Sequence, residues 1–182
     1  MSRAELTPFS YVILALVGEG GAGPHDLVRA MRQGRVYWSA AESHYYAEPK
    51  RLQKLGYLDS RKEPGRTRER THYVLTTSGR EALRRWVVEP ASLPRIQNEA
   101  VVKLLAGDIA GDDAALLRAL GAMRTDIADA GARLDIADAV AQTLPHRVRY
   151  LRLVHSLGRR ILATHLDWLD EVERELTRRR RR

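Results

Sequence analysis

The amino-acid sequence predicts a mainly α-helical chain with one small β-hairpin. Three observations predict this fold class. The segment from Ser39 to Leu55 has helical periodicity and stops before Gly56, a residue type that often ends helices. A short arginine-rich hairpin pattern follows it, and beyond the proline-containing segment 90–94 only helical patterns remain. We therefore expect three regions, which are a winged helix-turn-helix (1–90), a helical dimerisation domain (91–177) and a polybasic tail (178–182).

Composition and charge narrow the class of protein. The 182 residues carry a net charge of +8, of which 1–90 contribute +5, 91–177 contribute −2 and 178–182 contribute +5. An excess of positive charge at one end favours contact with nucleic acid there, although ordinary surface charge would also explain it. Cysteine is absent, which excludes disulfides and thiolate metal sites and fits a reducing compartment. The sequence shows no secretion signal and no apolar run of the roughly 20 residues that span a membrane. We expect a cytoplasmic protein.

Two short helices are predicted before Ser39. Thr7 is a good N-cap and Pro8 suits the first helical position, so the first helix begins there and ends at Gly18. Pro24 starts the second, which ends at Gly34.

The third helix carries the first set of candidate binding residues. Ser39 and Glu42 match a capping box at its start. Four residues at helical spacing should face the core, namely Ala41, Tyr45, Leu52 and Leu55. The outward face comprises Ser39, Ser43, Tyr46 and Lys50, flanked by His44, Arg51 and Lys54.

A hairpin and a fourth helix complete the N-terminal region. Segments 57–61 and 71–75 alternate apolar and polar residues, and the segment 63–69 between them holds turn residues and charge. Thr77 or Ser78 is the expected N-cap of the next helix. Its expected apolar side is Leu83, Trp86 and Val87.

Three helices are expected in the C-terminal region, over about 96–106, after Asp112-Asp113, and from Pro145 onward. The last one has a 3-4 stripe made of Val154, Leu157, Ile161, His165, Trp168 and Val172. A second stripe beside it contains Leu151, Leu162, Leu166 and Leu169. A helix that is apolar on two sides buries both, so one side packs on its own domain and the other on a partner. A second copy of the chain is the simplest partner, which predicts a homodimer.

Several short motifs are spread over the chain, at segments 43–46 and 50–58, at 73–76 with Gly79-Arg80 after the hairpin, and at Glu99 with 103–105. Through these motifs the sequence resembles the PadR family of bacterial transcriptional regulators. The resemblance covers nearly the whole chain. The resemblance implies a dimer whose C-terminal helices exchange contacts, and a role as a repressor.

One position departs from the family pattern. The family usually has proline directly after the tyrosine of the third helix, where this chain has Ala47, and here Pro49 stands where leucine is usual. A proline inside a helix removes one amide hydrogen bond and clashes with the carbonyl four residues earlier. We therefore predict a bend near Tyr45 and Tyr46.

The third helix and the hairpin supply the candidate DNA contacts. These are Ser39, Ser43, His44, Tyr46, Lys50, Arg51, Arg66, Arg68 and Arg70. Hydroxyls and lysine mostly bind phosphate, whereas Arg51 or His44 can reach base edges. The hairpin arginines suit phosphate or minor-groove contact. The competing interpretation is a solvated helix face beside a mobile charged loop.

The function we predict is a sequence-specific DNA-binding regulator, a homodimeric repressor acting on a near-palindromic operator. An effector would act by changing the angle between the C-terminal helices, and the sequence leaves open whether it is a small molecule. The alternative is a winged-helix adaptor that binds proteins only. No phosphate loop, nucleophile–base pair or carboxylate cleft suggests an enzyme, and the six histidines lack metal-ligand spacing, so we expect no cofactor and no metal. The arginine tail would add only non-specific attraction to DNA.

Overall fold

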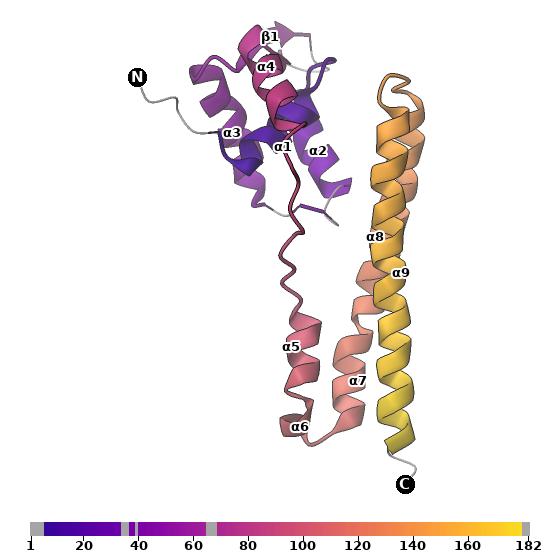
Figure 1. The fold of residues 1–182 in the computed structure, drawn as a ribbon. Coiled ribbons are helices and arrows are strands. Elements are labelled where there is room, and N and C mark those ends of the chain that lie inside the picture. Colours follow the sequence, from indigo (N-terminus) through magenta and orange to yellow (C-terminus); the bar gives the residue numbers. More distant parts are fainter. Residues whose placement is uncertain (1–5, 34–36, 39, 65–68, 180–182) are drawn as a thin grey trace. The chain divides into compact units, whose positions relative to one another are not determined.

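The computed structural model describes residues 6–33, 37–38, 40–64 and 69–179. The chain divides into two compact units. The N-terminal unit ends at Ser92, and the C-terminal unit comprises the chain from Leu93 onward together with Tyr37. The N-terminal unit combines helices with a two-stranded sheet, and the regular secondary structure in the described residues of the C-terminal unit is all helical (Figure 1). The predicted fold class, mainly α-helical with a small hairpin, is confirmed.

In the part of the N-terminal unit that the structure describes, there are four helices and a hairpin. In chain order they are α1 (Pro8–Val17), α2 (Pro24–Gln33), α3 (Glu42–Lys54), β1 (Leu58–Glu63), β2 (Arg70–Leu75) and α4 (Thr77–Trp86). The strands are antiparallel, with Leu58 opposite Leu75 and Glu63 opposite Arg70. Ala22, between α1 and α2, exchanges two backbone hydrogen bonds of 3.0 Å with Tyr73, which attaches that loop to the hairpin.

The start of α1 agrees with its sequence signal. Thr7 is the N-cap, and its hydroxyl accepts a hydrogen bond of 3.2 Å from the Ser10 amide. The Ser10 hydroxyl in turn accepts one of 3.0 Å from the Thr7 amide, which completes a capping box. Pro8 occupies the first turn, where its missing amide hydrogen leaves no bond unmade.

The start of α3 differs from the prediction. The helix begins at Glu42, its N-cap is Ala41, and no side chain caps it. Glu42 pairs with Arg32 of α2 at 3.0 Å, so its carboxylate serves a tertiary contact and forms no capping box. Ala41 is exposed, so its predicted core position is wrong, and Ser39 lies outside the described residues.

The cap of α4 also differs from the prediction. Thr76 is the N-cap, one residue before the first predicted candidate. Its hydroxyl accepts from the Gly79 amide at 3.1 Å and donates to the Gly56 carbonyl at 2.7 Å. Gly56 follows the C-cap of α3 at a φ of 79°, the left-handed conformation that favours glycine. One hydroxyl therefore joins the end of α3 to the start of α4.

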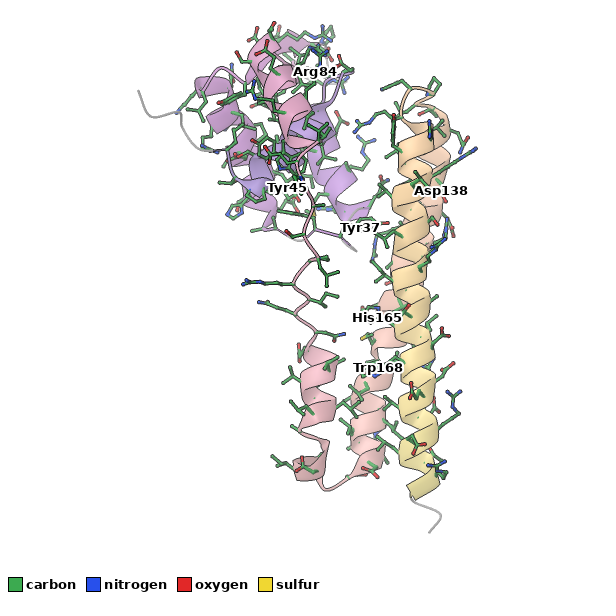
Figure 2. The ribbon with its side chains drawn as sticks, viewed as in Figure 1. Tyr37, Tyr45, Arg84, Asp138, His165 and Trp168 are labelled. Atoms are coloured by element: carbon green, nitrogen blue, oxygen red, sulfur yellow. The ribbon has the colours of Figure 1, made fainter. Side chains whose placement is uncertain are left out.

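The core of the N-terminal unit lies among the helices and one face of the hairpin. Its fully buried members include Ile13, Leu14, Leu27, Tyr45 and Leu52. Figure 2 labels Tyr45 in the interior of this unit. Leu83 packs against the core, and Trp86 stacks on Tyr11 with ring centroids 4.6 Å apart. Val87, predicted on the same apolar side, is exposed because α4 has already ended at Trp86.

The C-terminal unit contains five helices within its described residues. They are α5 (Glu99–Leu105), α6 (Gly107–Ala110), α7 (Asp113–Gly121), α8 (Met123–Gln142) and α9 (Val148–Arg179). The helix predicted after Asp112-Asp113 is broken at Ala122 into α7 and α8. The α8 and α9 helices lie side by side (Figure 1). Because α9 continues to Arg179, part of the predicted tail is helical, and residues 180–182 lie outside the described ones.

A polar cluster links α8 to α9. Nδ1 of the buried His155 lies 2.5 Å from Asp138 Oδ1, and Arg159 pairs with Asp138 and, at 2.9 Å, with Asp135. Asp138 is one of the residues labelled in Figure 2. The His155 hydrogen bond lowers the pKa of the Asp138 carboxyl, and the Arg159 hydrogen bond adds to this while burial opposes it. The ionised carboxylate is therefore the form that the fold favours.

This cluster predicts a specific loss of stability in acid. The folded pKa of this carboxyl lies below its ordinary value of 3.8. Ionisation of the carboxyl therefore contributes to the stability of the folded state, and the contribution is fully present at any pH above that ordinary value. The contribution disappears as the pH falls through the lowered folded pKa. We expect the Asp138→Asn variant to have a lower melting temperature than the native protein at neutral pH. The difference between the two melting temperatures should shrink below about pH 4. Thermal unfolding followed by circular dichroism measures it, with the exposed Asp129→Asn as control, and a pH-independent difference would contradict the assignment.

Candidate nucleic-acid interface

One side of α3 is open to a ligand. Ser43, His44 and Lys50 are exposed, as their helical spacing predicts. Tyr46 is half-buried, and its ring lies edge-on to His25 with centroids 6.1 Å apart. This face therefore offers a hydroxyl, an imidazole and an ammonium group to an approaching anion.

Arg51 is placed differently from its neighbours. Its guanidinium binds Glu48 in a bidentate manner, with Nε 2.9 Å from Oε2 and Nη2 2.8 Å from Oε1. The same Nη2 lies 3.0 Å from the hydroxyl of Ser10 in α1. The side chain that we expected to reach a base edge therefore already has partners within the protein. The spacing of Arg51 from Glu48, one helical turn, was visible in the sequence, whereas the Ser10 partner was not.

Pro49 lies inside α3 and its side chain is fully buried. The helix continues past it to Lys54, because the missing amide hydrogen bond is one of many and the ring packs in the core. The bend near Tyr45 and Tyr46 stays a prediction.

At the loop end of the hairpin, two arginines and a histidine surround one carboxylate. Glu63 pairs with Arg61 at 3.0 Å and with Arg70 at 3.5 Å, and its Oε2 lies 3.4 Å from Nδ1 of His72. Arg61 and Arg70 remain exposed. The sequence singled out Arg70 but missed Arg61, because the first strand was expected to end there. Arg66 and Arg68 lie outside the described residues.

Apolar side chains are left exposed on α9. Val154 and Leu157 of the predicted dimerisation stripe are 44 % and 53 % exposed, whereas Ile161, His165 and Trp168 are half-buried. Val172 was expected to belong to the dimer contact, but its side chain is buried in the core of its own unit. It packs there because α9 lies against α7.

The first helix of the unit lines the same surface. Ile96, Val101 and Val102 form a groove with Leu157 and Ile161 of α9. His165, labelled in Figure 2, also lines it, with Nδ1 2.7 Å from the Ile161 carbonyl oxygen and Nε2 3.5 Å from the side-chain Nδ2 of Asn98. The α5 side of this groove carried no periodic signal of its own in the sequence, because α5 is only seven residues long.

The described residues contain no candidate metal site and no candidate membrane-spanning helix. In the parts of the chain that the structure covers, no three His, Asp or Glu side chains cluster in a way that would hold a metal ion. No helix among them is both long enough and apolar enough to cross a bilayer.

An exposed helix face followed by a cationic hairpin defines the winged helix-turn-helix class of nucleic-acid-binding folds. Comparison with known proteins narrows this class. The chain is 29 % identical over 96 residues to the negative transcriptional regulator PadR of Bacillus subtilis. This match covers 51 % of the chain and spans about half, 53 %, of that relative.

Solved structures match over a greater length. Bacillus subtilis PadR in complex with operator DNA has a TM-score of 0.71 and 22 % identity, over 93 % of this chain and 99 % of that one. The same regulator with p-coumaric acid has a TM-score of 0.66 and 20 % identity, over 95 % and 99 %. No protein-family model matches the chain. The chain has the same winged-helix fold as these PadR structures.

Proposed function

We propose that this protein is a sequence-specific DNA-binding transcriptional regulator that acts as a homodimeric repressor in the cytoplasm. The observation that carries this proposal is the open polar face of α3, together with the exposed arginines at the loop end of the hairpin. Ser43, His44 and Lys50 enter the major groove, and Arg70 contacts the adjacent backbone.

The relatives support the repressor role and the DNA partner. The curated relative is named a negative transcriptional regulator, and the same regulator has been solved with operator DNA. Residues 1–90 then act as the DNA-binding domain and 91–177 as the dimerisation domain. The relatives are not enzymes by name, and we assign no catalytic activity to this chain.

A dimer gives the protein two copies of α3. Copies that enter successive major grooves must lie roughly 34–36 Å apart, which fits a near-palindromic operator. The exposed Val154 and Leu157 of α9 are covered by the second copy in this arrangement.

A small-molecule effector regulates the dimer in this proposal. Its support is the relative solved with p-coumaric acid. Binding changes the angle between the C-terminal helices and hence the spacing of the two α3 copies. Such a change is large at the DNA only if the dimer has two discrete packings.

Salt dependence tests the DNA contacts. If about 6–10 phosphates are contacted, log affinity for duplex DNA should fall with log salt at a slope of roughly −5 to −9. Arg70→Ala should make the slope shallower by about one, because one phosphate contact is lost. Fluorescence anisotropy over a salt series measures both quantities, with Asp129→Asn as the control.

Selection of bound duplexes from a random pool tests sequence specificity and stoichiometry together. We expect a palindromic consensus. A slope near zero, or a pool that never enriches, would instead favour the adaptor function without DNA recognition.

A further inference from the structure

A polar network joins α1 to the middle of α3, and two of its three members, Ser10 and Glu48, are largely or fully buried. Ser10 is completely buried, and its hydroxyl donates to Glu48 Oε1 at 2.7 Å. Arg51 donates to both oxygens of Glu48 and, through Nη2, to the Ser10 oxygen. The Ser10 hydroxyl also lies 3.1 Å from that of Thr7, the N-cap of α1. The helix that faces the ligand is therefore tied to the first turn of the helix behind it.

The network occupies the guanidinium group of Arg51, the group that this residue would need for contact with DNA. Both carboxylate oxygens of Glu48 accept hydrogen bonds, and only 13 % of its side chain is exposed. Burial raises the pKa of Glu48, but the hydrogen bonds from Arg51 and Ser10 outweigh this and lower it, so the carboxylate stays ionised. A bidentate guanidinium–carboxylate pair has a fixed geometry as well as strong attraction. Arg51 would have to break these bonds to reach a base.

The position of the network explains what it can do. Glu48 and Arg51 flank Pro49, where α3 lacks an amide hydrogen bond. Side-chain bonds across to α1 supply restraint at the point where the backbone has less of it. The orientation of Ser43 and Lys50 depends on how this part of α3 packs against α1.

We propose that Ser10, Glu48 and Arg51 form a positioning network that seats α3 on α1, so that Arg51 acts in DNA recognition through Glu48 and contacts no base. The inference rests on the proposed DNA-binding function. It makes Glu48 as important as Arg51, although a carboxylate on this helix would ordinarily repel DNA.

The direction in which Glu48→Gln changes the affinity for DNA distinguishes this inference from the alternative, in which Arg51 contacts a base. If the network positions α3, Glu48→Gln and Arg51→Met each lower affinity for the selected duplex by about 3- to 30-fold. The double variant then loses no more than the worse single variant, because both act through one network. Affinity for an unrelated duplex changes little, so the ratio of specific to non-specific affinity falls. A role in stability alone would leave that ratio unchanged at temperatures where the protein is folded.

If Arg51 instead reads a base and Glu48 restrains it, Glu48→Gln raises specific affinity while Arg51→Met lowers it and relaxes preference at one base pair. That result overturns the inference, as does an unchanged ratio in both variants. Glu42→Gln is the matched control, because it removes a carboxylate from the same helix whose partner, Arg32, lies in a more exposed pair. The ratio should not move in this control.

Circular dichroism establishes that each variant is folded before affinity is compared. Ser10→Ala, which removes only the hydroxyl, replaces Glu48→Gln if the latter does not fold, and it should lower the same ratio. A native protein that binds no duplex would overturn the proposed function. A native protein that binds, with a Glu48 variant that binds more tightly, would overturn only the positioning network.

Discussion

Leu157→Asp is expected to make the protein monomeric and to lower its affinity for a palindromic operator by about 100- to 10,000-fold, the gain that linked binding sites usually provide. Leu157 is 53 % exposed on α9, beside Val154, which is 44 % exposed. Within an interface between two copies, the new carboxylate would be taken from water without a partner, which is costly. Sedimentation measures the oligomeric state, and anisotropy with whole and half operators measures affinity.

Ile136→Asp provides the matched control for that experiment. Ile136 is 57 % exposed on α8, outside the predicted stripe, so the same charge should leave dimer and affinity unchanged. Binding of the Leu157 variant to a half operator should resemble that of the native protein. A dimeric Leu157→Asp protein with full operator affinity would show that this stripe is not the dimer contact.

Gly79→Ala is expected to destabilise the N-terminal unit by about 2 kcal/mol, although alanine is the better helix former by about 1 kcal/mol. A Cβ at this position would lie 2.1 Å from the Tyr57 carbonyl oxygen. That oxygen belongs to the backbone and also accepts a hydrogen bond from the Thr76 amide at 3.2 Å. The start of α4 would have to move away from the hairpin, and the bond between Thr76 and Gly56 would weaken.

Hydrogen exchange of the α3 and α4 amides measures the Gly79 effect, because it reports the opening free energy of one unit separately from the other. Ser78→Ala is the control, since this neighbouring position is exposed and should change exchange by less than about 0.5 kcal/mol. Faster exchange confined to α9 would contradict the proposed cause, because α9 belongs to the other unit.

Local patterns determined much of the fold in advance. Thr7 and Pro8 start α1 because a cap and a proline act within one turn of helix. Gly56 ends α3 because its left-handed backbone favours glycine. The hairpin follows from alternation on two short segments, and the exposure of Ser43, His44 and Lys50 follows from helical periodicity. Each of these depends only on residues close together in the chain.

The tertiary structure alone decided which of two competing partners a side chain takes. Arg51 binds Ser10, which lies 41 residues earlier, and Glu42 binds Arg32, which moves the start of α3 away from its expected cap. Val172 enters its own core because α9 packs against α7. Helical periodicity predicts whether a side chain faces the core or the solvent. It does not predict which partner a polar side chain at the edge of the core will bind, because only helix packing brings distant residues within about 3 Å of each other. The sequence therefore determined the helix-and-wing class by itself, and packing determined which arginines pair within the protein.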